Sequence, residues 1–250
     1  MLVILIPSAF EAKDLLARVT GRRNFRASTT TGARPVHAAC YRGRFAGHEV
    51  MVGIIGMGPP HAARRAEAVL HEAKKRAGAG KIRGVILAGF AGALKPGVRR
   101  GEIFVTAGAA HVMSHLPENE RAPEAPLHTA AALVATAAAK AELHASTGAA
   151  LVDMEQAEVE KVAAAAGLPF FGLRIVSDEA HEELPHELLS RAYNQAAGVQ
   201  TPLRLAGHLT RNPFKAMQLA SFVRPLPPLR TRLTERLHTW LTLTGSRCFR

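Results

Sequence analysis

The stretch "LVDMEQAEVEKVAAAAGLPFFGLRIVSDEA", residues 151–180, decides the fold because it joins a helix of small side chains to a buried strand. Apolar and alanine side chains recur at helical spacing from about Asp153 onward. Gly167 and Pro169 then end the helix, since glycine adopts the left-handed conformation of a helix terminus and proline cannot continue the helix. The apolar run "PFFGLRIV" that follows is typical of a strand buried on both faces of a parallel sheet.

The same alternation of buried strands and helices runs through the preceding residues. We expect strands at 2–6, 48–58, 82–94, 101–112 and 169–176, and helices at 11–19 and 60–78. Strands that alternate with helices form a mostly parallel sheet. With 250 residues and 48% hydrophobic side chains, the chain is long enough for one large core. The predicted fold class is α/β: a single domain with a central, mostly parallel twisted sheet flanked by helices.

The composition narrows the classes of partner. The net charge of +12 favours anionic ligands, but the sequence contains no zinc finger and no RNP motif, so we expect no nucleic acid partner. Cys40 and Cys248 lie far apart without a CxxC spacing, which favours a cytoplasmic, reducing location. The N-terminal run "MLVILIPSAF" lacks the features of a signal peptide and is predicted to be a strand. No apolar run approaches the roughly 18 residues that span a bilayer.

Ligands of a parallel sheet bind beyond the carboxyl ends of its strands. Three segments are expected to meet at that rim: "GMGPP", "AGFAGAL" and "SDEA". Glu155 reaches the rim at a helix start and Asp178 reaches it at a strand end. Acids also stabilise helix N-termini, so capping is an alternative for both of these residues and is the expected role of Asp153.

Three motifs in this order resemble the nucleoside phosphorylase and nucleosidase superfamily: "GMGPPHAARRAEAVL", "GVILAGFAGALKPGVRRGEI" and "ALVDMEQAEVEKVAAAAGLPFFGLRIVSDEA". Together they span about residues 50–180. Members of this superfamily cleave the bond between a base and ribose. The resemblance therefore implies an N-glycosidase with the nucleoside phosphorylase type of α/β fold, and it also implies a homo-oligomer.

The resemblance assigns different groups to the two ends of the bond. Breaking it places positive charge on ribose and extra electrons on the purine. Glu155 is expected to bind two adjacent ribose hydroxyls, with Met154 packing on the sugar. Asp178 is expected to protonate or hydrogen-bond purine N7, with Ser177 orienting it. Glu11, in the loop after the first strand, is expected to activate water.

The nucleophile is expected to lie at the glycine loop, where Gly56 and Gly58 permit close backbone approach. A structural turn is the alternative for either glycine. Phe90 or Ala91 stands where many relatives have a hydroxyl that helps to hold phosphate or ribose. This departure favours water as the nucleophile, although phosphate stays open as a co-substrate, and no other cofactor is expected. No metal site is expected, because two histidine pairs lack a third ligand: His111 with His115, and His181 with His186.

A narrower resemblance involves "GMGPPHAARRAE", "DEAHEELP" and "NPFKAMQLASFV", which look like the subgroup associated with hopanoid biosynthesis. It implies that adenine is released from adenosylhopane, an adenosyl lipid. We assign residues 1–210 to the catalytic domain and 211–250 to a basic amphipathic extension of the same domain. The basic residues after residue 200 are Arg204, Arg211, Lys215, Arg224, Arg230, Arg232, Arg236, Arg247 and Arg250.

The extension has two interpretations. It would hold the enzyme at the inner membrane if its cations met anionic lipid and if Trp240, Leu237 and Leu241 entered the interface. The alternative is that it packs on the domain with its arginines in water. The function has alternatives too: a soluble methylthioadenosine or S-adenosylhomocysteine nucleosidase, a purine nucleoside phosphorylase, or a catalytically weak nucleoside-binding protein. The substituent at the ribose 5′ position stays open.

Overall fold

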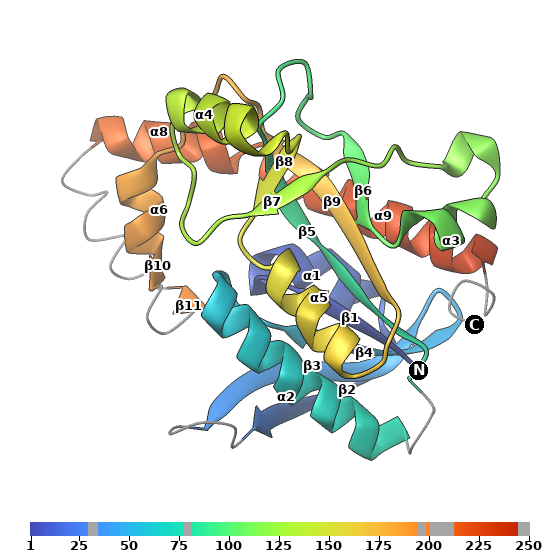
Figure 1. Cartoon of the computed structure of the whole chain (residues 1–250). Coiled ribbons are helices and arrows are strands. Elements are labelled where there is room, and N and C mark those ends of the chain that lie inside the picture. The colour runs from blue at the N-terminus through green and yellow to red at the C-terminus, as the bar shows by residue number, and fades with distance from the viewer. Residues whose placement is uncertain (30–34, 78–81, 195–198, 201–212, 245–250) are drawn as a thin grey trace.

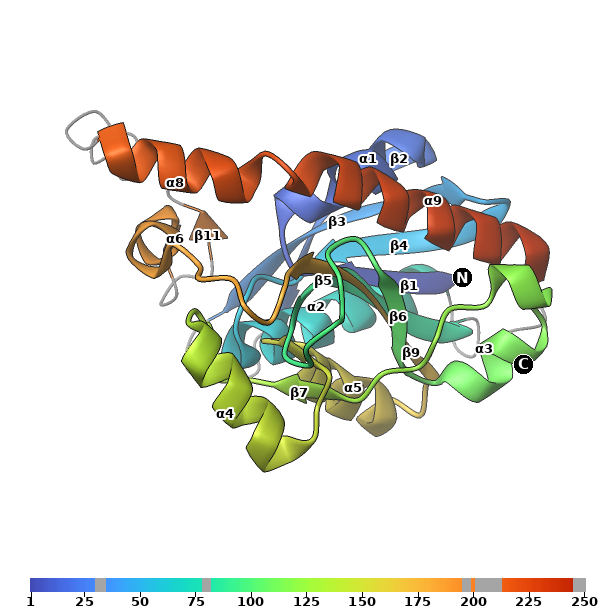
Figure 2. The same cartoon turned by 90° about the horizontal axis from the view of Figure 1, so that it is seen from above.

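The computed structural model describes residues 1–29, 35–77, 82–194, 199–200 and 213–244. These residues form one nine-stranded sheet with helices on both faces (Figures 1 and 2). The predicted fold class is confirmed, since the structure is a single α/β domain around a mixed, mostly parallel sheet. A further two-stranded pair, β10 (Tyr193–Asn194) and β11 (Val199–Gln200), lies apart from it.

Four parallel strands form the centre of the sheet, in the order β4, β1, β5 and β9. Their bounds are β1 Leu2–Ile6, β4 His48–Ile54, β5 Gly84–Ala93 and β9 Phe170–Asp178. All four were expected, and they are almost entirely buried because the sheet is covered on both faces. Their carboxyl ends consequently meet at one rim of the sheet.

Antiparallel strands extend the sheet on both sides. On one side β2 (Thr20–Thr29) and β3 (Val36–Phe45) form a hairpin that pairs with β4. The sequence analysis missed this hairpin because β2 is largely exposed and rich in arginine, so it lacks an apolar pattern. On the other side lie β6 (Ile103–Ala107), β7 (Leu127–Thr129) and β8 (Leu151–Asp153). The strand expected at 101–112 ends early and continues into helix α3, Ala109–Ser114.

The helices complete two layers. Helices α2 (Pro59–Ala77) and α5 (Gln156–Ala165) cover one face, where Val3 and Leu5 of β1 point. Helices α1 (Ala9–Arg18) and α9 (Leu226–Thr244) cover the other face, where Leu2 and Ile4 point (Figure 2). The smaller elements are α4 Ala137–Thr147, α6 His186–Ala192, α8 Pro213–Val223 and the 3-10 turn Glu118–Glu120.

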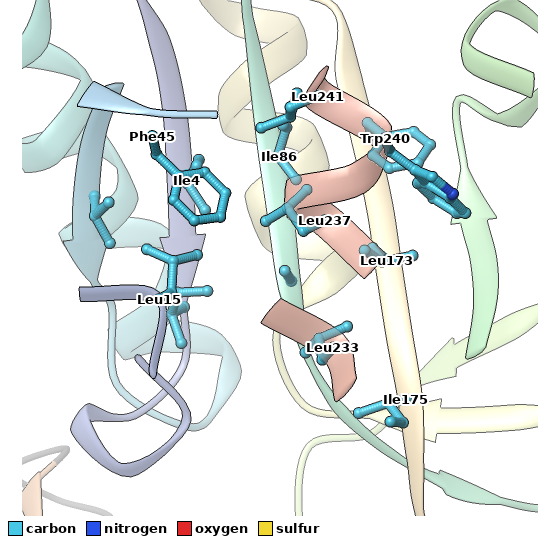
Figure 3. Close-up of a cluster of buried hydrophobic side chains, with 14 of the residues drawn as sticks. Ile4, Leu15, Phe45, Ile86, Leu173, Ile175, Leu233, Leu237, Trp240 and Leu241 are labelled. Carbon is cyan, nitrogen blue, oxygen red and sulfur yellow. The ribbon is translucent and has the colours of Figure 1, made fainter. Parts of the chain in front are cut away.

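Helix α9 corrects the expectation that the tail's apolar face meets a membrane. Trp240, Leu237 and Leu241 are 1%, 1% and 3% exposed, and they pack against Ile86 and Leu173 of the sheet (Figure 3). These side chains lie in the core because the sheet would otherwise expose this apolar face to water. The structure supports the alternative, in which the tail packs on the domain.

Two cations of the tail form ion pairs that help to hold α9 on the domain. Arg230 lies 2.9 Å from Asp14 of α1, and Arg236 lies 2.8 Å from Glu120. The expected boundary at 210/211 falls outside the described residues, and so do Arg204, Arg211, Arg247 and Arg250. Among the described helices, none is long and apolar enough to cross a bilayer.

We predict that Trp240→Ala lowers the free energy of unfolding by about 3–5 kcal/mol, the usual cost of emptying a large aromatic site in a core. The indole Nε1–H donates to the carbonyl of Glu120 at 2.8 Å, so that hydrogen bond is lost as well. Leu243→Ala is the matched control, because Leu243 belongs to the same helix and is 48% exposed. Urea unfolding of both variants checks this, and equal losses would contradict the packing described.

Candidate active site

Five polypeptide segments deliver polar groups to the rim where the parallel strands end. They are the start of α1 after β1, the glycine loop after β4, the last residues of β5, the turn between β8 and α5, and the end of β9. The sequence analysis expected the glycine loop, the end of β5 and the end of β9 at the rim, together with Glu155 at a helix start. It did not place the start of α1 there. The buried acids among the described residues gather here: Glu11, Asp153, Glu155 and Asp178.

Glu11 lies in the first turn of α1, which Ser8 caps. The Ser8 hydroxyl donates to Glu11 Oε1 at 2.7 Å, and the backbone N–H of Phe90 donates to Oε2 at 2.9 Å. A Cβ atom at position 89 would come within 2.7 Å of this Oε2, so Gly89 permits the approach. Burial raises the pKa of Glu11, although its hydrogen bonds act in the opposite direction.

Glu155 occupies the N-cap position of α5, and its Oε1 accepts a hydrogen bond from the backbone N–H of Gly58 at 3.0 Å. Gly58 has a φ of 94°, which favours glycine, and the methyl of Met154 lies about 4.0 Å from where a Cβ of this residue would stand. Burial, followed by the charge of Asp153, raises the pKa of Glu155 to about 8. The structure thus brings Gly58, Met154 and Glu155 together, as the sequence analysis expected.

Asp153 differs from Glu155 in its partners. It accepts the backbone N–H of Gln156 at 2.9 Å, which is the capping contact expected of it. The same oxygen forms an ion pair with Arg174, whose side chain is fully buried in β9. The other oxygen accepts the hydroxyl of Thr129 at 2.8 Å.

Arg174 was missed by the sequence analysis. Its signal was a single charged residue inside the apolar run "PFFGLRIV". Its Nε and Nη1 atoms are buried and have no hydrogen-bond partner among the described residues. The positive charge of Arg174 lowers the pKa of both Glu11 and Glu155, which partly offsets the effect of burial. Arg174 therefore lies close to both acids. A buried guanidinium beside two carboxylates gives this part of the rim a fixed positive charge.

Asp178 lies at the end of β9 and is 4% exposed. The hydroxyl of Ser177 donates to its Oδ1 at 2.6 Å, so the expected orienting contact is present. The ammonium of Lys140 donates to its Oδ2 at 2.7 Å, a contact that the sequence analysis did not anticipate. Gly92 leaves room for this carboxyl group, because a Cβ atom at position 92 would stand 3.0 Å from Oδ2 of Asp178.

Strand β5 links the acidic groups. Phe90 binds Glu11 through its N–H, Ala91 accepts the Ser177 hydroxyl at 3.2 Å, and Gly92 stands opposite Asp178 in the sheet. Glu11 and Glu155 are close enough for the charge of Glu11 to raise the pKa of Glu155 further. The candidate residues from the sequence therefore gather around the end of one strand. No group of three or more metal-binding side chains is arranged to hold an ion within the described residues.

The chain belongs to the phosphorylase superfamily, because the family model with that description matches residues 1–137 and 114–203. No curated protein matches the chain. The expected class, the nucleoside phosphorylases and nucleosidases, is thereby confirmed at the level of the superfamily. The hopanoid subgroup is a finer assignment that this match does not address.

Solved structures share the fold. An S-adenosylhomocysteine nucleosidase from Streptococcus pyogenes, in complex with 5-methylthiotubericidin, has a TM-score of 0.67 at 18% identity, covering 96% of this chain and 95% of that chain. The native futalosine hydrolase of Helicobacter pylori strain 26695 has a TM-score of 0.64 at 16% identity, covering 96% of each chain. A methylthioadenosine/S-adenosylhomocysteine nucleosidase from Neisseria meningitidis has a TM-score of 0.65 at 15% identity, covering 96% of this chain and 98% of that chain. At these identities the likeness is one of fold.

The raised pKa of Glu155 predicts a pH dependence of stability. Between the ordinary glutamate value of 4.5 and about 8, the folded protein keeps a proton on Glu155 that the unfolded chain has released. The free energy of unfolding therefore falls as the pH rises through this window. In Glu155→Gln this contribution is absent, so thermal unfolding midpoints should fall less with pH than in the wild type. Glu160→Gln, an exposed change in α5, is the control and should keep the wild-type slope. Parallel slopes for all three proteins would contradict the burial of Glu155.

Proposed function

We propose that this protein cleaves the N-glycosidic bond of a purine nucleoside and releases adenine. The observation that carries the proposal is the proximity of Glu11 and Glu155, both buried and both accepting a backbone N–H, beside the buried guanidinium of Arg174. Membership of the phosphorylase superfamily supports the same reaction class. The structural neighbours named above are themselves nucleosidases and a futalosine hydrolase.

Glu155 and Met154 form the proposed ribose site. A glutamate accepts hydrogen bonds from the two adjacent ribose hydroxyls when it is ionised, and its charge then stabilises the positive charge that develops on the sugar. The pKa of about 8 means that the free protein holds Glu155 protonated at neutral pH. Hydroxyl donors favour the ionised form, so binding of ribose is expected to release this proton.

Glu11 is the proposed base that takes a proton from water. Its raised pKa makes it a stronger base than an ordinary glutamate, as long as the pH is high enough to ionise it. Phe90 offers a backbone N–H to Glu11 but no side-chain hydroxyl for phosphate. Water is therefore the proposed nucleophile, and the proposed products are adenine and a free ribose derivative.

Asp178 is the proposed partner of the leaving purine. An adenine that departs with a proton on N7 leaves as a neutral molecule, which lowers the barrier to bond cleavage. Within the described part of the chain, Oδ1 of Asp178 accepts a hydrogen bond only from the Ser177 hydroxyl, and this is the oxygen proposed to face the base.

Methylthioadenosine is the probe that tests the proposal. We expect adenine release that does not require phosphate, with no ribose 1-phosphate derivative among the products. Glu11→Gln and Asp178→Asn should each lower kcat by about 10²–10⁴, the usual contribution of one acid or base group. The matched control is Glu160→Gln, which should keep the wild-type rate. Strict dependence on phosphate would overturn the choice of water, and wild-type rates in both variants would overturn the site. Tight binding of the nucleoside without any turnover would instead favour the nucleoside-binding alternative.

The finer proposal for the substrate is an adenosyl lipid of the adenosylhopane type. The resemblance of the three motifs to the hopanoid subgroup supports it. Exposed apolar side chains on α8 also support it, since Met217 is 63% exposed and Val223 is 37% exposed. Because α9 is part of the core, any contact with a bilayer is assigned to α8 and to exposed cations such as Arg224 and Arg232.

An adenosyl lipid in anionic vesicles provides the test. We expect a higher kcat/KM for this substrate than for methylthioadenosine, and lower activity when salt screens the cations. Met217→Ser should weaken sedimentation with the vesicles while leaving turnover of methylthioadenosine unchanged. Equal or lower activity on the lipid, together with no sedimentation, would return the assignment to a soluble nucleoside.

A further inference from the structure

Helix α4 buries a charge where a helix normally buries an apolar side chain. Every residue of α4 is described, and Lys140 is its only buried side chain, with no exposed surface at all. An ammonium group withdrawn from water is costly unless it is paired, and well-packed apolar residues usually stabilise a fold at least as well. Packing alone therefore does not account for a lysine at this position.

The ammonium is held by three oxygens. It donates to Asp178 Oδ2 at 2.7 Å, and to the carbonyl oxygens of Glu179 and Glu182 at 2.8 and 3.0 Å. An ammonium has three N–H groups, so each of them is satisfied. The two carbonyls belong to the segment directly after Asp178. Lys140 is thus fixed in direction, and it is aimed at the carboxyl group proposed to face the purine.

Other charged side chains lie near the Lys140–Asp178 pair, but they bind to each other or to the backbone. Glu182 lies 2.7 Å from the guanidinium of Arg100, and the backbone N–H of that arginine binds Glu179. His181 lies 3.8 Å from Glu179. From α4 itself, the backbone N–H of Ala137 binds Glu183. None of these cations is described in contact with Asp178, so Lys140 is the cation assigned to it.

The contact leaves the two oxygens of Asp178 unequal. Oδ2 accepts a hydrogen bond from the ammonium, while Oδ1 accepts one only from the Ser177 hydroxyl among the residues that the structure describes. That hydroxyl has a second acceptor, the carbonyl of Ala91 at 3.2 Å. Its single proton is free to turn to Ala91 when Oδ1 carries a proton of its own. Oδ1 is therefore the oxygen of Asp178 that can exchange a proton with a ligand.

We propose that Lys140 is a positioning residue for purine release: it orients the Asp178 carboxyl group and stabilises the carboxylate that remains once Asp178 has given its proton to the purine. The inference rests on the proposed function. As the C1′–N9 bond breaks, its electron pair stays on the purine, and the Oδ1 proton forms a bond to N7. A water oxygen bonds to C1′ and passes its proton to Glu11. Exchange with solvent then returns a proton to Asp178, and Glu11 releases its own.

A double-mutant cycle tests the inference with methylthioadenosine as the probe. Lys140→Met should lower kcat/KM by about tenfold to a hundredfold, the size of one lost hydrogen bond to a charged group. In the Asp178→Asn background the same change should alter kcat/KM by less than about twofold, because Lys140 acts through Asp178. The matched control is Lys161→Met, which removes a lysine that is 71% exposed on α5 and should have no effect in either background.

Two further measurements separate this role from a structural one. Lys140→Arg keeps a cation at the position and should retain more kcat/KM than Lys140→Met. Binding of free adenine, measured by calorimetry, should weaken in Lys140→Met and in Asp178→Asn, and no further in the double variant. Thermal unfolding confirms that each variant is folded at the assay temperature.

The outcomes are distinct. Equal losses from Lys140→Met in both backgrounds would show a structural role and overturn the inference, while leaving the proposed function in place. Wild-type rates in Lys140→Met would also overturn the inference and would leave the proposed function in place. A wild-type protein that neither binds adenine nor releases it would overturn the proposed function and this inference together.

Discussion

The carboxyl end of β5 is the constraint on which the site depends. Neighbouring strands β1 and β9 run parallel to β5 on either side, so all three end at the same rim. The residues "GFAG" at this end are small except for Phe90, and this allows carboxyl groups to approach the backbone from two directions. A Cβ at Gly89 would meet Glu11, and one at Gly92 would meet Asp178. A larger residue at either position would displace an acid that the proposed reaction requires.

Burial then gives the acids different properties. Glu11 and Glu155 each receive one backbone N–H and share the influence of Arg174, and burial raises both pKa values. Asp153 and Asp178 each have a cation of their own, Arg174 and Lys140 respectively. A rim whose acids differ in burial and in charged partners is equipped to treat the two ends of a glycosidic bond differently. The net charge of the chain plays no part in this, because the cations that matter are two buried side chains.

Much of the framework was predictable, because continuous apolar runs and helical spacing are local signals. The four central strands and helices α1 and α2 were all expected near their observed bounds. The β2–β3 hairpin was not, since an exposed, arginine-rich strand carries no apolar pattern. The tail was predicted to be an amphipathic helix, but the pattern does not say which apolar surface the helix covers. Tertiary packing determines which surface the helix covers: α9 buries the apolar side chains on the α1 face of the sheet.

The same division applies to the site. The sequence alone determined the α/β framework, the superfamily and the segments that carry Glu11, Gly58, Glu155 and Asp178, because strand ends and motif order are properties of the chain. Only the tertiary structure revealed that Lys140 and Arg174 partner two of the buried acids. Lys140 is 38 residues from Asp178 along the chain, and a lone lysine in an alanine-rich helix is ordinarily solvated. Pairing of distant charges depends on which surfaces exclude water together, and that is decided when the layers pack.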